Sequence, residues 1–190
     1  MEDSAQKTVL RWWQSMVMSP AQLNDLNIIP APSAHKAQLR RCESADAVML
    51  TEGFRALWLR LDDNITASAN SNAIECWATI ASALVYVKEN GKDDLASVAG
   101  RREAGDKSLV SEMRFAQLQS AKTPDDFLRR LRRIIQQVKG EVSVVKLAAD
   151  IQQWFFEHNS LMPRNADKRI SVQWAMAYYR SASAAAKPKK

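Results

Sequence analysis

Residues 127–138, FLRRLRRIIQQV, constrain the fold more than any other stretch, because their apolar positions recur at helical spacing. On a helical wheel the apolar side chains lie between roughly 140° and 260° from Arg129. They are Phe127, Leu128, Leu131, Ile134, Ile135 and Val138. Arg130, Arg132 and Arg133 fall outside this arc. We therefore expect an amphipathic helix that buries one side and exposes four arginines on the other.

Both ends of this helix carry recognisable signals. Thr123 is suited to cap the first turn, and Pro124 can occupy the first helical position, where a missing N–H is tolerated. Asp125 and Asp126 then face the positive end of the helix dipole. Gly140 can adopt the left-handed conformation that ends a helix. The sequence therefore predicts a helix over residues 124–139.

The rest of the chain also shows helical rather than alternating periodicity. Only five Gly and six Pro occur among 190 residues, which argues against a barrel or sandwich of many short strands. Ser44 and Ser143 are suited to cap two of the other helices. The further expected helices cover residues 7–18, 36–42, 44–61, 72–89, 109–121, 144–158 and 168–180. We expect an all-α fold, with an irregular connection at residues 19–35 and a polar break at residues 62–71.

Residues 100–107, GRREAGDK, form the most polar, glycine-containing stretch of the interior. We place a boundary there between two helical subdomains, both helical bundles. The first covers residues 1–105, and the second, basic one covers residues 106–180. Residues 181–190 are expected to form a flexible tail.

The net charge of +6 is unevenly distributed. Residues 1–100 contain nine Lys and Arg against 12 Asp and Glu, whereas residues 101–190 contain 18 against nine. A basic C-terminal half favours an anionic partner on one side of the protein. Random variation of surface charge is the alternative.

The arginine face of residues 127–138 allows three interpretations. A solvated face usually mixes charges of both signs, but here the acids are confined to the N-terminal end. Arginine can bind phosphate through two hydrogen bonds, which favours phosphate binding; contact with an acidic protein and simple solvation are the alternatives. The candidate binding residues are Arg40, Arg41, Arg101, Arg102, Lys107, Arg129, Arg130, Arg132 and Arg133. Arg114, Lys139, Arg164, Lys168 and Arg169 could extend this surface.

The sequence offers little for catalysis, a metal or a cofactor. His35 and His158 lack ligands at metal spacing, and the paired aspartates lie at expected helix ends, where capping explains them. Asp150 is expected to form a buried structural hydrogen bond. Cys42 and Cys76 are expected to be reduced thiols of a cytoplasmic protein, with a disulfide as the alternative. We expect neither a membrane span nor a signal peptide.

Several motifs of the C-terminal half occur in an order that resembles a known family. They are RFAQLQSAKTPDDFLRRLRRIIQQV, VSVVKLAADIQQWF and RISVQWAMAYY. The chain resembles the CasB family, the small subunit of the type I-E CRISPR effector complex Cascade. The residues that carry the resemblance are Arg114-Phe115, Leu131-Arg132-Arg133, Leu147, Asp150, Trp154, Trp174-Ala175 and Tyr178-Tyr179. Met176 departs from the pattern, because some relatives have arginine there.

The resemblance implies a non-catalytic, all-helical subunit of a ribonucleoprotein. Its implied partners are the repeated backbone subunit and the large subunit of Cascade, the guide RNA (crRNA), target DNA and a second copy of itself. Its implied role is to bind DNA backbone and stabilise the R-loop, especially the displaced strand. Replacing a DNA duplex by an RNA–DNA hybrid is nearly balanced in free energy, so backbone contacts can decide the outcome. The alternative is a helical adaptor whose arginine face docks an acidic protein.

Overall fold

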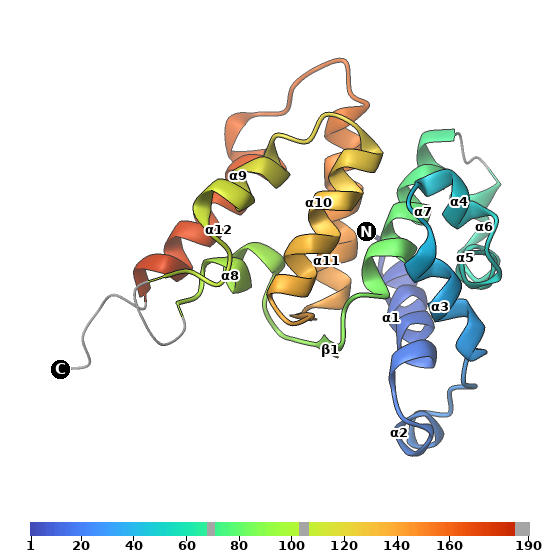
Figure 1. The fold of residues 1–190 in the computed structure, drawn as a ribbon. Helices are drawn as coiled ribbons and strands as arrows, with labels where there is room; N and C mark the ends of the chain where they lie inside the picture. Colours follow the sequence, from blue (N-terminus) through green and yellow to red (C-terminus); the bar gives the residue numbers. More distant parts are fainter. Residues whose placement is uncertain (68–70, 103–106, 185–190) are drawn as a thin grey trace.

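The computed structural model describes residues 1–67, 71–102 and 107–184, and these residues form a mostly helical protein (Figure 1). The all-α expectation is confirmed, apart from a short parallel pair of strands, in which Glu89 is opposite Glu141 and Asn90 opposite Val142. The elements in chain order are α1 (Asp3–Val17), α2 (Pro20–Asp25), α3 (Ser33–Arg41), α4 (Ala45–Met49), α5 (Glu52–Trp58), α6 (Asp63–Thr66), α7 (Ser71–Leu84), β1 (Glu89–Asn90), α8 (Leu95–Gly100), α9 (Glu112–Gln119), α10 (Pro124–Gln137), β2 (Glu141–Val142), α11 (Val144–His158), the 3₁₀ helix η1 (Ala166–Lys168) and α12 (Ile170–Ala184).

The helix that carries the arginines, α10, begins at the predicted residue and ends at Gln137, two residues before the predicted end. The Thr123 side chain accepts a hydrogen bond from the backbone N–H of Asp126, and Pro124 is the first helical residue. Lys139 and Gly140 have positive φ angles of 60° and 78°. The N–H of Gly140 donates to the carbonyl of Ile135 at 2.9 Å, which satisfies one of the last carbonyls of the helix. Local sequence therefore determines both ends of α10.

Other helix boundaries differ from the prediction. The single helix expected over residues 44–61 is wrong: the chain forms α4 and α5, because the Thr51 side chain caps a new helix by accepting from the N–H of Phe54 at 3.2 Å. Helix α7 ends at Leu84 instead of residue 89. Helix α8, in a segment for which no helix was predicted, is capped by Asp94, which accepts from the N–H of Ser97 at 2.8 Å.

The core is continuous and rich in aromatic residues. The six apolar residues expected on the inner side of α10 are all buried, which confirms the apolar side predicted for this helix. The Phe127 ring stacks on Trp154 with centroids 4.1 Å apart, and Phe115 stacks on Tyr178 at 4.9 Å. Five of the six tryptophans are buried, whereas Trp58 is partly exposed. These ring contacts join α10 to α11 and α9 to α12.

Helices from both predicted subdomains contact one another. In Figure 1, α1 to α7 lie on one side, α8, α9 and α12 on the other, and α10 and α11 between them. Helix α8 packs on α12 so closely that a Cβ on Gly100 would lie 2.2 Å from the carbonyl oxygen of Tyr178. The division into residues 1–105 and 106–180 stays a prediction. Residues 103–106 at that boundary and 185–190 of the expected tail lie outside the described residues.

Within residues 1–67, 71–102 and 107–184, no helix is long and apolar enough to cross a membrane. Both cysteines are free thiols, in agreement with the expected reduced state. Cys76 is buried, and desolvation raises the pKa of its thiol to about 12, with the nearby Glu75 acting in the same direction. This thiol is therefore protonated, and unreactive, at neutral pH.

Candidate nucleic-acid interface

The four arginines of α10 have different environments, although the sequence predicts the same exposed face for all of them. Arg129 and Arg133 are exposed, and Arg130 is partly exposed. Arg132 is only 9% exposed. The expectation that Arg132 lies on the solvated face is therefore wrong.

The Arg132 guanidinium is enclosed by oxygen atoms of two other helices. Nη1 donates to the carbonyl of Cys42 at 2.6 Å, and Nη2 donates to the carbonyl of Leu39 at 3.4 Å. Nη2 also donates to the hydroxyl of Ser82, and Nε reaches the Ser82 carbonyl at 3.4 Å. The guanidinium lies 5.3 Å from the centroid of the Tyr86 ring. We call this arrangement the arginine cage.

The acceptors of the cage explain why a buried cation is tolerated there. Leu39 lies in the last turn of α3, Cys42 follows that helix, and Ser82 lies in the last turn of α7. Carbonyls at helix C-termini lack an intrahelical donor and carry partial negative charge. Burial lowers the pKa of Arg132, while Tyr86 and Cys42 act in the opposite direction. The Arg132 side chain therefore joins α10 to the ends of α3 and α7.

Arg40 belongs to the same part of the structure. Its Nη2 donates to the carbonyl of Val85 at 3.2 Å, just beyond the end of α7. Its guanidinium lies 5.5 Å from the centroid of the Tyr86 ring, whose hydroxyl donates to the Arg40 carbonyl at 3.1 Å. Unlike Arg132, Arg40 remains exposed. It is therefore engaged in the fold but still accessible to a ligand.

Asp126 pairs with two arginines of the outer face. Its Oδ1 accepts from Arg129 at 2.6 Å and from Nε of Arg130 at 2.8 Å. Partial desolvation acts to raise the pKa of Asp126, but the hydrogen bonds and charges of Arg129 and Arg130 outweigh it, and the pKa is lowered. Two of the arginines on the outer face of α10 are therefore paired with an acid, which the sequence alone did not indicate.

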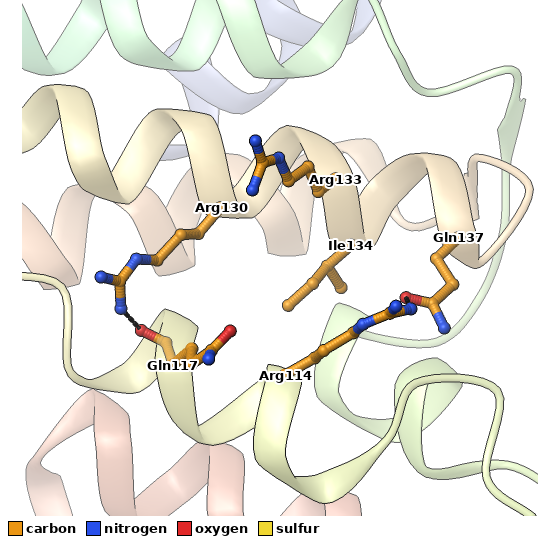
Figure 2. A pocket seen from close by; sticks show the side chains of 6 residues that line it. All are labelled: Arg114, Gln117, Arg130, Arg133, Ile134 and Gln137. Atoms are coloured by element: carbon orange, nitrogen blue, oxygen red, sulfur yellow. Dashed lines mark hydrogen bonds between the residues drawn. The ribbon is translucent and has the colours of Figure 1, made fainter.

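Arg133 differs from its three neighbours. It is exposed, and among the described residues its side chain has no hydrogen-bonding or ionic partner. It borders a hollow of about 460 Å³ between α9 and α10. Figure 2 shows the residues that line this hollow: Arg114, Gln117, Arg130, Arg133, Ile134 and Gln137. Three of the six are arginines and none is acidic, so we call this hollow the α9–α10 groove.

Hydrogen bonds hold the walls of the α9–α10 groove in place. Arg130 Nη1 donates to the carbonyl of Gln117 and, at 3.2 Å, to the hydroxyl of Ser120, both near the end of α9. Arg114 donates to the side-chain oxygen of Gln137 at 3.2 Å. The Gln137 amide in turn donates to the carbonyl of Leu109 at 2.8 Å. The groove therefore presents fixed N–H donors around an open space, an arrangement suited to phosphate oxygens.

The opposite flank of α10 has a different charge. A second hollow there is lined by Arg129, Arg132 and Arg133, but also by Glu43, Asp125 and Asp126. Carboxylates repel phosphate, so this flank suits an anion less well than the α9–α10 groove. Arg133 lies on the ridge between the two hollows and borders both.

The remaining predicted residues lie near the two ends of this region. Arg41 and Lys107 are exposed, and neither has a polar partner among the described residues. Arg101 forms an ion pair with Asp93, and its carbonyl accepts from the N–H of Leu109 at 2.8 Å. Arg102 is partly buried. Leu109 is hydrogen-bonded both to Arg101 and to Gln137, and it therefore connects Arg101 to the α9–α10 groove. Arg41 directly precedes Cys42 of the arginine cage.

Sequence reasoning did not identify Gln117 and Gln137, and it considered Arg114 only as a possible extension. Gln137 lies four residues after Arg133, one helical turn further along the same edge, and this spacing was the available signal. The contribution of α9 depends on tertiary packing, which no local pattern reveals.

Among the residues considered for catalysis, Asp150 has a structural role. Asp150 accepts a hydrogen bond from Nε1 of Trp174 at 2.9 Å, which confirms the expected structural bond. Desolvation raises the pKa of Asp150 to about 7, partly opposed by that hydrogen bond. His158 is exposed and stacks on Trp154, whereas His35 is not a surface residue, because its side chain is only 12% exposed. Within the described part of the chain, no group of His, Cys, Asp and Glu side chains could hold a metal ion.

The fold and the groove together define an all-helical protein with an arginine-lined groove. A comparison with protein families matches residues 35–179 to the family described as CRISPR-associated protein Cse2. The chain therefore belongs to the Cse2 family, also called CasB, which is the small subunit of type I-E Cascade, as the resemblance indicated. No curated protein and no solved structure matches the chain.

Proposed function

We propose that this chain is a non-catalytic subunit of Cascade that binds the DNA backbone and stabilises the R-loop. The observation that carries the proposal is Arg133, an exposed arginine without a partner among the described residues, on the rim of a groove lined by arginines and free of acids. Membership of the Cse2 family supports the context of guide-directed DNA recognition.

The proposed contact does not depend on base sequence. Arginines and side-chain amides bind phosphate oxygens, which every nucleotide carries, and such contacts give affinity rather than sequence specificity. A displaced single strand held along α10 would favour the open state without selecting a target. We assign direct contacts to Arg133, Arg114 and Arg130, with Arg129, Arg41, Arg101, Arg102 and Lys107 extending the surface. In this scheme Arg132 positions α10, and Arg40 joins α3 to the segment after α7.

The proposal includes contacts with the other Cascade subunits, the crRNA and a second copy of the chain. Large apolar side chains remain exposed along one side of α12: Val172 is 37% exposed, Met176 59% and Tyr179 47%. Their spacing of four and three residues places them on one helical face. Apolar side chains grouped in this way are typical of a surface that another protein covers.

R-loop formation by the assembled complex tests the proposal. We expect R133E, and more strongly R114E together with R133E, to reduce target-DNA opening at about 0.15 M salt, where phosphate contacts still contribute. K7E reverses the charge of an exposed residue on α1, far along the chain from the groove, and is the matched control. R-loop formation that is unchanged in both groove variants would contradict the proposal.

Competition separates the proposal from the alternative of an acidic protein partner. For single-stranded DNA, the logarithm of affinity falls by about 0.7 for each phosphate contact per tenfold increase in salt. We expect R133E to lower this slope by about that amount. Two results together would favour the adaptor. An acidic protein would displace DNA from the wild type, and R133E would show the same salt dependence of DNA affinity as the wild type.

A further inference from the structure

Two hollows outside the proposed DNA surface share a wall where α1, α5 and the segment of residues 27–32 meet. The first has a volume of about 260 Å³ and the second about 170 Å³. Ile29 and Arg60 line both. Neither alone reaches the roughly 300 Å³ typical of a small-molecule pocket. The shared wall therefore suggests one site with two compartments.

The first compartment suits a phosphate group. It is lined by Arg11 and Arg60 together with Thr8, and no acidic residue lines it. Arg11 Nη2 donates to the carbonyl of Asn27 at 3.2 Å, which holds the guanidinium at the rim and leaves its other N–H donors available. Arg60 is exposed, and its side chain has no polar partner in the described ranges.

The second compartment is narrow and mostly apolar. Trp12, Pro30 and Pro32 line it, and the Trp12 N–H is already used, because it donates to the carbonyl of Gly53 at 3.0 Å. Ile29 is 84% exposed and lines both compartments. Flat, apolar walls of this kind suit an aromatic ring.

His35 brings a buried, unsatisfied polar atom to the lining of the second compartment. Its Nε2 lies 3.5 Å from Oε2 of Glu52, whereas Nδ1 is buried without a hydrogen-bond partner among the described residues. A carboxylate beside Nε2 favours the tautomer that carries its proton there, which leaves Nδ1 as an acceptor. Buried acceptors are nearly always satisfied, so the compartment suits a ring that brings an N–H donor.

We propose that this two-compartment site binds one nucleotide unit. The phosphate lies between Arg11 and Arg60, and the base enters the second compartment with an N–H group directed to His35. The unit is either a free mononucleotide or part of a single strand, since both present the same chemistry. The site shares no residue with the α9–α10 groove, so the proposal does not rest on the proposed DNA surface.

Nitrogen NMR of the histidine rings tests the proposal on the 190-residue chain. The chain contains only two histidines, so H158A assigns the His35 signals directly. We expect dAMP to shift the His35 Nδ1 resonance in a saturable manner, whereas inorganic phosphate competes with dAMP but produces little shift alone. R60E should weaken dAMP binding about tenfold, the loss of one charge-assisted hydrogen bond. K122E changes an exposed lysine that lines neither compartment and should bind as the wild type does.

The other outcomes are equally informative. No saturable His35 shift with dAMP, or a shift unaffected by R60E, overturns the proposal. An equal shift from phosphate alone overturns the assignment of the second compartment to a base. A single-stranded oligonucleotide that reproduces the dAMP shift identifies a strand as the source, and failure to do so identifies the free nucleotide. R133E should leave every dAMP result unchanged, which separates this site from the groove.

Discussion

Arg132 and Arg133 are adjacent in the sequence but face two different regions of the protein. On one flank of α10, Arg132 is enclosed by the C-terminal carbonyls of α3 and α7. On the other flank, Arg133 borders an open groove with other arginines. The difference shows that a basic helix can use one arginine to hold the fold while the next stays exposed beside a groove. The number of arginines alone does not separate these roles.

The largest expected effects concern the fold. R132A should lower the free energy of unfolding by about 3 kcal/mol, because it leaves buried carbonyls without donors and removes packed methylene groups. R133A should change it by no more than about 0.5 kcal/mol, as is usual for an exposed residue. Urea denaturation of the two variants measures both values. Equal stability of the two variants would refute the arginine cage.

Asp150 extends the comparison to a buried carboxyl group. Its pKa of about 7 lies above the unfolded value, so its contribution to stability is fully present below about pH 4 and is lost as the pH rises through 7. D150N keeps an acceptor for the Trp174 N–H but cannot ionise. We expect it to be more stable than the wild type above pH 7, by up to about 4 kcal/mol, and to flatten the dependence of stability on pH between pH 4 and 7.

Urea denaturation across this pH range measures the Asp150 effect. D167N changes an exposed aspartate and is the matched control. A wild type whose stability rises steadily from pH 4 to pH 8, with the same slope in D150N, would show that Asp150 is ionised in the folded protein.

A smaller effect is expected for DNA binding. R133A should weaken single-stranded DNA binding by the assembled complex about fivefold to tenfold, the loss of one phosphate contact. R129A should have a weaker effect, because Asp126 already neutralises part of its charge. Affinity measured at one fixed salt concentration gives the ranking. A larger loss in R129A than in R133A would contradict the importance of the unpaired side chain.

The smallest effect is expected for Asp126 itself. D126N removes the negative charge shared by Arg129 and Arg130, so we expect about twofold to fivefold tighter binding of single-stranded DNA. It should also destabilise the first turn of α10 by about 0.5 kcal/mol, because a charge near the positive helix end is lost. D125N tests the same helix end without touching that arginine pair. Weaker DNA binding in D126N would show that the ion pairs with Asp126 hold Arg129 and Arg130 in the orientation that binds DNA.

Local sequence predicted α10 well, because its caps and apolar spacing are short-range signals. The same reasoning gave the six buried residues of its inner face and the structural role of Asp150. It missed the break at Thr51, where a capping hydroxyl interrupts a periodic pattern. It also missed the burial of Arg132, since the acceptors come from residues about 50 and 90 positions away in the chain. Likewise, the α9–α10 groove depends on packing between two helices that no helical wheel describes.

Crosslinking from position 133 in the assembled complex tests the central claim most directly. A photoreactive amino acid replaces Arg133 in one variant and Lys7 in the other, and target DNA is bound before irradiation. The proposed function predicts a crosslink from position 133 to the displaced DNA strand and none from position 7. A crosslink from position 133 only to another protein, or equal DNA crosslinking from both positions, would contradict it.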